Sequence, residues 1–495
     1  MSSKNKNNFK LNLEFLNKDK NFGFLNKLQK KFPKVEIYLV GGAVRDLFLK
    51  KATKDYDFVI CKIKASDLEK FLANLGQVEF VGKSFGVFKF TPHGGDKHNP
   101  FDIALPRRDF SFNTGGYRDV KVLTNPNLPI EEDLSRRDFT INAIAVELKT
   151  GNIIDQFNGL KDLKNKVIRS VGKPKDRFKE DYSRMLRAIR FACQLDFQIE
   201  KNTWQAIKSK IKSITKAVPY EIIAREFLKS FYFNPVKALD LFDQSGFFKV
   251  IMPEILKMKN CPQPKNFHSE GDVWVHTRLA LEKLFSPQFK KQFNNERPNT
   301  ELIIATFFHD LGKPPTIQTP EKNHTDRIRF NEHDVVGAEK TKKICERLKF
   351  SSPENFGVDP EKIAWLIKNH MLLVHGNALK MRPQTIEKYF FNPNLPGENL
   401  LKLSFADISA TILEKGHSDF GDFKNMLKRI KELKKLSANK KELPKPILNG
   451  NEIMKEFKIK SGPRIGELLG ILREKQLEGK IKDKKSAVKF LKKFI

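Results

Sequence analysis

Two aspartates, Asp55 and Asp57, are separated by a single residue at the start of a short apolar run. Because side chains alternate along a strand, both carboxylates are expected on one face, where a divalent cation would relieve their repulsion. An earlier apolar run ends in Gly41 and Gly42, and a helical pattern that contains Arg45 follows. Glycines let backbone N–H groups approach a ligand, and a helix start favours phosphate. This stretch therefore predicts a metal site beside a phosphate cradle.

Each half of this stretch has an ordinary alternative, since Gly-Gly is usually only a turn and D-x-D is usually a solvated strand end. Their order and spacing favour a joint function. Residues 38–60, YLVGGAVRDLFLKKATKDYDFVI, resemble the signature of the nucleotidyltransferase superfamily that includes DNA polymerase β. More closely, they resemble its tRNA nucleotidyltransferase and bacterial poly(A) polymerase branch. The resemblance implies that Asp55 and Asp57 are catalytic and hold Mg²⁺. Asp102 is either a third carboxylate of this site or a salt-bridged strand residue.

A second motif, RRDFTINA, occupies residues 136–143. Paired arginines can grip a triphosphate through forked hydrogen bonds, and Asp138 and Asn142 can read ribose hydroxyls. The alternative is a helix cap with a local ion pair. The run is similar to a second motif of the same family, in the expected order. The resemblance implies that Arg137, Asp138 and Asn142 bind the nucleotide together with the glycines and Arg45.

A third motif opens an amphipathic helix at residues 183–193. Its apolar residues share one arc, whereas three arginines occupy the opposite arc without compensating acids on that face, which favours an anionic ligand. The alternative is a solvated basic face. The run is similar to the family's E-D-x-x-R motif. This similarity implies that Asp181 and Arg184 form a protein template for C and A, and that Arg187 and Arg190 contact nucleotide phosphates.

A second chemical centre is expected in the C-terminal half, where eight of the ten histidines fall. Imidazoles and carboxylates are the usual ligands of hydrolytic metal sites. The spacing resembles HD-type phosphohydrolases, which implies a divalent metal of unknown identity and a substrate such as a 2′,3′-cyclic phosphate or phosphomonoester. The implied ligands are His276, His309, Asp310 and Asp407, with His333 and His370 as the extra ligands of two-metal members. His268 and His375 are read as bystanders.

The composition limits the partners and the compartment. The 495 residues carry a net charge of +33, which would attract polyanions even if it reflects genome bias. Four scattered cysteines indicate a reducing compartment and no zinc finger. The basic N-terminus lacks the apolar core of a signal peptide, and no apolar run approaches a membrane span. We therefore expect a soluble, cytoplasmic protein with no membrane contact and no evident protein partner.

The predicted fold class is α+β, with a small mixed sheet and helices in the N-terminal head and helices throughout the rest. The expected segments are a basic N-terminal extension, the catalytic head, a helical neck and body, the HD domain and a basic helical tail. They span residues 1–34, 35–160, 161–255, 265–430 and 431–495. The first eight residues are expected to be disordered, residues 111–130 to form a mobile loop, and residues 254–270 to form a linker.

The resemblance as a whole implies template-independent addition of CCA to the 3′ end of tRNA from CTP and ATP, with pyrophosphate released. The alternatives are a poly(A) polymerase and an enzyme that adds only CC or only A. Lys83 and Ser84, in a turn where poly(A) polymerases of this branch typically carry two basic residues, weigh against the first. An alternative of another class is an HD phosphohydrolase with a non-catalytic, RNA-binding N-terminal part.

Overall fold

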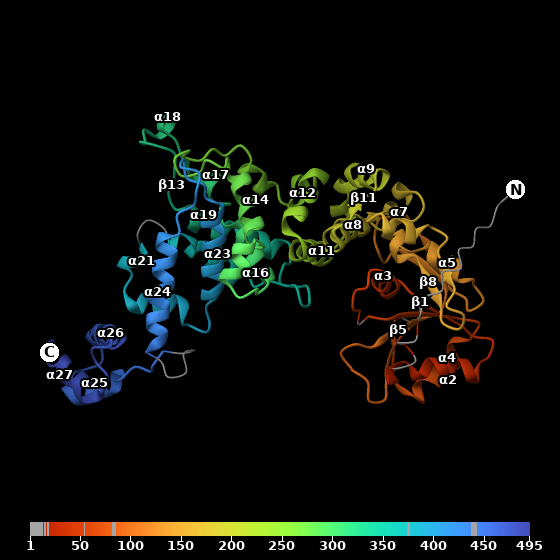
Figure 1. Ribbon diagram of the computed structural model, residues 1–495, viewed down its shortest axis with the longest axis horizontal. Coiled ribbons are helices and arrows are strands. Elements are labelled where there is room, and N and C mark those ends of the chain that lie inside the picture. Colours follow the sequence, from red (N-terminus) through yellow and green to blue (C-terminus); the bar gives the residue numbers. More distant parts are fainter. Residues whose placement is uncertain are drawn as a thin grey trace. The chain divides into compact units, whose positions relative to one another are not determined.

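The computed structural model describes residues 13, 16, 19–53, 55–81, 86–373, 377–436 and 443–495. The first eight residues, the turn at 82–85 and His375 lie outside this part. The chain forms two compact units, Met1–Ile251 and Met252–Ile495. The predicted α+β class is confirmed, because a large mixed sheet lies in the first unit and helices dominate the rest (Figure 1). Among the described residues, no helix combines the length and apolarity that a membrane crossing requires.

A seven-stranded sheet forms the centre of the head, in the order β3-β4-β5-β2-β1-β8-β9. Its strands are β1 (Glu36–Val40), β2 (Asp57–Cys61), β3 (Gly76–Val81), β4 (Val87–Pro92), β5 (Phe101–Ala104), β8 (Ala145–Glu147) and β9 (Ile153–Ile154). Among the described strands of this sheet, only β2 and β5 pair in parallel, and their register sets Asp57 beside Asp102. The antiparallel pairing of β1 with β2 sets Val40, which precedes the glycine turn, opposite Asp57.

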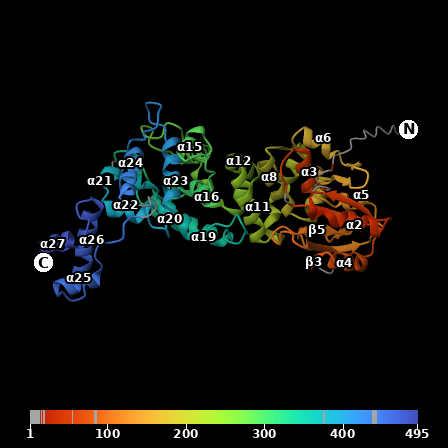
Figure 2. The same cartoon turned by 60° about the horizontal axis from the view of Figure 1, so that its bottom comes forward.

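Aromatic side chains fix the first described helices on this sheet. Phe22 ends η1 (Lys20–Phe22), and Phe24 belongs to α2 (Gly23–Lys31). The ring of Phe24 lies 4.8 Å from that of Phe90 and 5.4 Å from that of Phe101, so α2 packs beside β5 (Figure 2). This part of the expected N-terminal extension therefore contributes to the head's core. The sheet is flanked further by α3 (Gly42–Phe48) and α4 (Ala65–Ala73).

A separate two-stranded hairpin follows the sheet strands. It consists of β6 (Arg107–Ser111) and β7 (Val120–Thr124). The expectation of a loop over residues 111–130 is therefore wrong for Val120–Thr124, which form a strand, whereas residues 112–119 and 125–129 form no regular element. Residues 120–124 alternate in exposure along an antiparallel strand, and the glycines lie in the connecting turn.

Helices make up most of the remainder of the first unit. They are α5 (Ile130–Ser135), η2 (Thr140–Asn142), α6 (Gly159–Lys164), α7 (Pro174–Glu180), α8 (Ser183–Leu195), α9 (Lys201–Lys210), η3 (Ile211–Ser213), α10 (Ile214–Ala217), α11 (Tyr220–Phe233), α12 (Pro235–Ser245) and α13 (Phe247–Ile251). One short parallel pair, β10 (Val167–Ile168) with β11 (Gln198–Ile199), interrupts them. The apolar arc predicted for residues 185–193 is buried in α8, which explains why this helix faces the cleft with its arginines.

The second unit is helical apart from one short β pair, β12 (Ile317–Gln318) with β13 (Arg329–Phe330). Its helices are η4 (Pro253–Met258), α14 (Val273–Lys283), α15 (Pro287–Gln292), α16 (Thr300–Phe308), α17 (Lys313–Thr316), α18 (Pro320–Asn323), α19 (His333–Arg347), α20 (Pro360–Asn369), η5 (His370–Leu373), α21 (Asn377–Lys380), α22 (Pro383–Phe390), α23 (Gly397–Ala410), α24 (Gly421–Lys435), α25 (Gly450–Phe457), α26 (Pro463–Leu477) and α27 (Lys484–Leu491). The last three helices share a small core of their own.

The segment predicted as a linker, residues 254–270, is instead packed into the second unit. Ile255, Met258 and Cys261 are buried there. The side chain of Gln263 is also buried and bonds to Lys313 in the histidine-rich centre. Prolines suggested a linker, but the apolar residues between them contribute to the core.

Candidate active-site cleft and metal centre

A cleft of about 490 Å³ in the first unit brings together most of the predicted nucleotide-binding residues. The turn after β1 supplies Gly41, β2 supplies Asp57, and α3 supplies Gly42 and Arg45. The segment after α5, the residue that follows α7 and the helix α8 supply the other predicted lining residues, Arg137, Asp138, Asn142, Asp181, Arg184 and Arg187. Seven arginines and four aspartates line it, so the cleft is suited to a polyanion.

Gly41 is the point at which the backbone approaches both Arg137 and Asp57. It has a φ of +73°, which favours glycine. A Cβ placed here would lie 2.9 Å from Nη1 of Arg137 and 3.1 Å from Oδ2 of Asp57. The carboxylate and the guanidinium therefore converge on the glycine turn, where a phosphate could contact both a cation and a metal ion.

The three predicted carboxylates occupy adjacent strand ends. Asp57 begins β2, Asp102 lies beside it on β5, and Asp55 is exposed in the loop before β2. Because the strand starts only at Asp57, strand alternation does not place Asp55. Burial raises the pKa of Asp57 to about 6; Arg137 opposes the shift, and Asp102 and Asp55 add to it. A divalent cation would relieve this carboxylate repulsion, so the donor set fits a hard metal ion.

A chain of hydrogen bonds connects α3, the RRDFTINA motif and α8. Arg45 donates to Asn142 at 2.9 Å, and Asn142 donates to Asp138 at 3.2 Å. Arg187 forms a two-pronged contact with Oδ2 of Asp138, at 2.8 and 2.6 Å. Although burial opposes it, Arg187 lowers the pKa of Asp138 to about 2. These contacts fix the orientation of both arginines in the cleft.

The arginines of α8 do find compensating acids, all contributed from outside that helix. Arg184 bonds to Glu180 at 2.6 Å, and its Nε lies 3.9 Å from Oδ2 of Asp181. Arg190 bonds to Glu226 at 2.8 Å. Among the predicted nucleotide-binding residues, Arg190 is absent from the lining of the cleft. The argument that three unpaired arginines on this helix favour an anionic ligand therefore fails, because their charges are paired. Arg190 instead anchors α8 to α11.

Several cleft residues were missed by the sequence reasoning. Arg107, Asp109 and Tyr117 enter from the hairpin, and Ile222 and Arg225 from α11. No motif marks them, because their place depends on how the hairpin and α11 pack. An alternating pattern in residues 120–124 was the available signal for the hairpin.

In the second unit, the six predicted metal ligands converge. Oδ2 of Asp310 lies 3.3 Å from Nε2 of His309 and 3.8 Å from Nε2 of His276. Its Oδ1 lies 3.8 and 3.9 Å from Nε2 of His333 and His370. Oδ1 of Asp407, from α23, lies 2.9 Å from Nε2 of His276 and 3.6 Å from that of His309. Asp310 therefore faces two groups of imidazoles, an arrangement suited to two metal ions.

Backbone carbonyls orient three of these rings. The Nδ1 atoms of His309, His333 and His370 contact the carbonyl oxygens of Thr306, Phe330 and Ile367 at 2.8, 2.8 and 2.6 Å. Because each Nδ1 donates to a carbonyl, Nε2 is the nitrogen that faces the centre and is placed to bind a metal ion. This is the tautomer that metal ligation through Nε2 requires.

The charge balance of this centre also fits a metal. Although burial opposes protonation, Asp310 raises the pKa of His309 to about 10. Nε2 of His309 and Oδ1 of Asp310 are buried without a hydrogen-bond partner among the described residues. Sets of three candidate ligands with donor atoms within 4.8 Å of one another include His276–His309–Asp310 and Asp310–His333–His370. A cation would replace the proton on His309 and satisfy these orphaned atoms.

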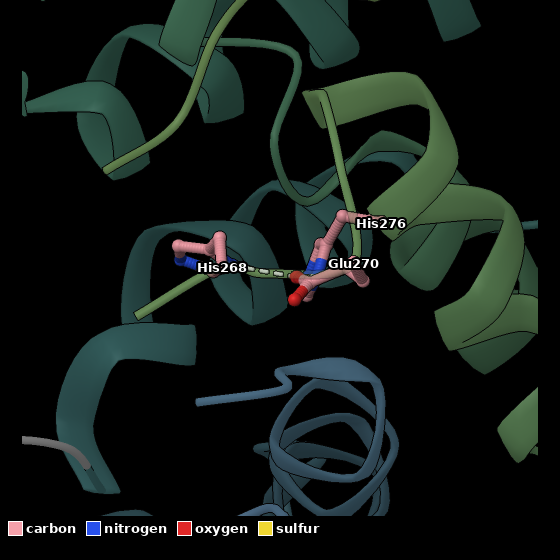
Figure 3. Close-up of side chains that lie close together, drawn as sticks. All are labelled: His268, Glu270 and His276. Atoms are coloured by element: carbon pink, nitrogen blue, oxygen red, sulfur yellow. Dashed lines mark hydrogen bonds and ion pairs between the residues drawn. The ribbon is translucent and has the colours of Figure 1, made fainter. Parts of the chain in front are cut away.

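The residues around His276 were missed or misread. Oε1 of Glu270 lies 2.7 Å from Nδ1 of His276 and 2.7 Å from Nδ1 of His268 (Figure 3). Although burial opposes it, these hydrogen bonds lower the pKa of Glu270 to about 2. His268 is therefore not a bystander to this network. Buried Lys313, 2.8 Å from Oδ2 of Asp310, was also missed.

Comparison with known proteins agrees with both centres. A family profile described as "Poly A polymerase head domain" matches residues 37–169, and one described as "HD domain" matches residues 276–392. A third, "Probable RNA and SrmB- binding site of polymerase A", matches residues 196–258. The "Multifunctional CCA protein" of Vibrio vulnificus (strain CMCP6) is 32% identical over 72% of this chain and 79% of the relative.

Two further matches extend over nearly the whole chain. The "A-adding tRNA nucleotidyltransferase" of Deinococcus radiodurans is 30% identical over 92% of this chain and 95% of the relative. The structure of the CCA-adding enzyme of Bacillus stearothermophilus in complex with CTP has a TM-score of 0.63 at 18% identity, covering 95% and 96% of the two chains. This second match shows the fold alone.

The head fold, the charged cleft and these matches define a nucleotidyltransferase that also carries an HD domain. Both kinds of domain depend on divalent metal ions. More particularly, the chain belongs to the tRNA nucleotidyltransferase and poly(A) polymerase family.

Proposed function

We propose that this protein adds the sequence CCA to the 3′ end of tRNA, using CTP and ATP and releasing pyrophosphate. The observation that carries the proposal is the cleft, in which Asp57 and Arg137 lie at the glycine turn, Asp181 lies just before α8 and Arg184 lies on α8. Transfer of a nucleotide to RNA without a template needs one group of residues that binds metal and phosphate and another that recognises the base. Asp57 and Arg137 form the first group, and Asp181 and Arg184 form the second. Cytoplasmic location stays a prediction from the sequence.

In this proposal, Asp55, Asp57 and Asp102 would hold one or two Mg²⁺ ions, whose positive charge would polarise the α-phosphate and neutralise the pyrophosphate that leaves. Arg137 and Arg187 face the triphosphate. Asp138 holds Arg187 in place through its two-pronged contact, and Asn142 does the same for Arg45. The protein's own contribution is to fix these cations before substrate arrives.

The choice of base is assigned to Asp181 and Arg184. Oδ1 of Asp181 accepts the N–H of Ser183 at 2.8 Å, which holds the carboxylate at the start of α8. C and A can satisfy this pair, whereas U and G would leave buried donors or acceptors unpaired. Asp181→Asn and Arg184→Lys should change the relative incorporation of the four nucleotides more than they change tRNA affinity. Uniform loss with unchanged preference would contradict the assignment.

The test of the main proposal uses tRNA lacking its 3′ end, with CTP and ATP supplied separately and together. Addition of two C residues followed by A supports it, and Asp57→Ala should abolish addition while tRNA binding persists. Because the Deinococcus radiodurans relative named as A-adding matches 92% of the chain, addition of A alone is the second candidate. It predicts activity only on tRNA that already ends in CC. Long A tails would instead indicate a poly(A) polymerase.

We also propose that the HD domain is a metal-dependent phosphohydrolase acting on 2′,3′-cyclic phosphates or phosphomonoesters. Its support is the six-ligand centre around Asp310. His309→Ala and Asp310→Ala should lose metal and hydrolysis together while nucleotide addition remains. A panel of divalent metals with a cyclic nucleotide tests this, and hydrolysis by both variants at the parent rate would remove the site. Hydrolysis by a parent that adds no nucleotide would favour a hydrolase with a non-catalytic, RNA-binding N-terminal part.

A further inference from the structure

The hairpin beside the cleft has two faces of different character. Its register sets Arg108 opposite Leu123 and Phe110 opposite Lys121, and residues directly opposite each other share a face. Phe112 follows Phe110 by two residues, and its N–H donates to Asp119 at 3.1 Å, so the same face continues beyond β6. We call these five residues, Arg108, Phe110, Phe112, Lys121 and Leu123, the outer hairpin face.

The outer hairpin face is open to solvent despite its apolar residues. Phe110, Phe112 and Leu123 are 50%, 66% and 48% exposed. Two-stranded hairpins gain little from their own packing, so such residues are not needed to hold the strands together. Large exposed aromatics grouped on one face indicate a binding surface.

The hairpin that carries this face is held beside the cleft on a fixed support. The opposite face contributes Arg107 and Asp109 to the lining. Arg108 forms a forked contact with Glu132 of α5, at 2.9 and 2.6 Å. At the far end of the hairpin, the carbonyl of Gly115 accepts the N–H of Tyr182 at 3.0 Å. The hairpin is therefore tied to α5 and to the start of α8, with one face in the cleft lining and the outer hairpin face on its other side.

We infer that the outer hairpin face binds the unpaired nucleotides of the RNA acceptor strand just before its 3′ end. This inference rests on the proposed nucleotide addition. Aromatic rings interleaved with cations suit single-stranded RNA, because bases stack on the rings and phosphates meet the cations. A protein partner fits less well, since interface centres are depleted of lysine. The strand must also end in the cleft with its 3′-hydroxyl at Asp57, so the nucleotides just before that end must pass the hairpin that contributes to the cleft.

The test compares Phe110→Ser, Phe112→Ser and the double variant with Val81→Ser. Val81 is a matched control, because it is 45% exposed on the edge strand β3 of the same head and lies outside the cleft lining. One RNA is a stem with a single-stranded 3′ overhang that carries 2-aminopurine, whose fluorescence is quenched on stacking. The other is the same stem with a blunt end.

We expect the double variant to raise the Kd of the overhang RNA at least about fivefold and to lose the quenching, as removal of one base stack would. Its Kd for the blunt stem and its KM for CTP should stay within about twofold of the parent, as should all values of Val81→Ser. Unchanged binding of the overhang RNA by the double variant would overturn the inference. An equal loss of affinity for both RNAs would also overturn the inference. So would self-association of the parent through this face, seen as a mass that rises with protein concentration for the parent but not for the double variant.

Failure of the proposed function is distinguishable. A parent that binds the overhang RNA with quenching but adds no nucleotide refutes nucleotide addition and leaves the RNA surface standing. A parent that adds nucleotides normally, with variants that bind and quench as it does, refutes the surface alone.

Discussion

Gly41 and Gly42 are neighbours that should respond very differently to one added methyl group. Gly41 has φ +73° and ψ −136°, a conformation that costs an L-residue about 1–3 kcal/mol. Its Cβ would also meet Arg137 at 2.9 Å and Asp57 at 3.1 Å. Gly42 begins α3, and its Cβ would have Nη2 of Arg45, at 3.6 Å, as its nearest contact, which is ordinary packing.

We therefore expect Gly41→Ala to lower kcat for CMP addition on the order of 100-fold, because both charged groups must shift to admit the methyl. Its strain should lower the midpoint of thermal unfolding by about 2–4 °C for each kcal/mol. Gly42→Ala should stay within about threefold of the parent, and alanine inside a helix should not destabilise it. The assay is single-turnover addition of labelled CMP to tRNA without CCA, with melting followed by circular dichroism. Equal activity of the two variants would refute the assignment of the turn.

Three further predictions concern charge and metal. Burial holds the pKa of Asp57 at about 6, above its unfolded value, so the stability it contributes is present below about pH 4 and is lost as pH rises through 6. Asp57→Asn should thus stabilise the metal-free head at pH 8 by up to about 3 kcal/mol in urea unfolding, while addition is abolished; a destabilised variant would contradict this. Arg187 lowers the pKa of Asp138 to about 2, against burial, so this stability is present above about pH 4 and is lost as pH falls through 2. Asp138→Asn should cost about 2 kcal/mol at pH 7 and reduce the acid sensitivity of the fold, whereas an unchanged acid titration would refute the pairing. Glu270→Gln should weaken metal binding at the HD centre about 10- to 100-fold, measured by competition with a chelating dye, because Glu270 orients His276; unchanged affinity would contradict that role.

Local sequence was enough to predict the elements that carry the chemistry. The glycine turn and the buried arc of α8 follow from spacing alone, because period and turn residues are local properties. The family motifs supplied the order in which the ligands occur. The pairing of Asp57 with Asp102 needed the strand order, which no local pattern contains.

The misses come from contacts between distant segments. Arg187 bonds to Asp138, which is 49 residues away in the sequence, and Arg190 bonds to Glu226, which is 36 residues away. The positive charges of this helix, which appear unpaired in the sequence, are therefore compensated by distant acids. Glu270 was overlooked because prolines made its segment look like a linker. In each case tertiary packing brings the interacting residue into place, and counting charges along one helix cannot reveal such a contact.

The three carbonyl contacts in the HD centre have a consequence for metal exchange. His309, His333 and His370 each contact the carbonyl of the residue three positions earlier, so every ring is held by its own turn of the backbone. These three ligands therefore do not depend on the ion for their orientation. The empty centre should remain folded, unlike small domains in which metal binding drives folding.

Removal of the ion with a chelator should therefore leave the helical circular dichroism of the protein unchanged. Metals of similar coordination preference would then replace one another without unfolding. We therefore expect supply and affinity to decide which ion the centre binds, and we expect this ion to be replaceable during the lifetime of one folded molecule.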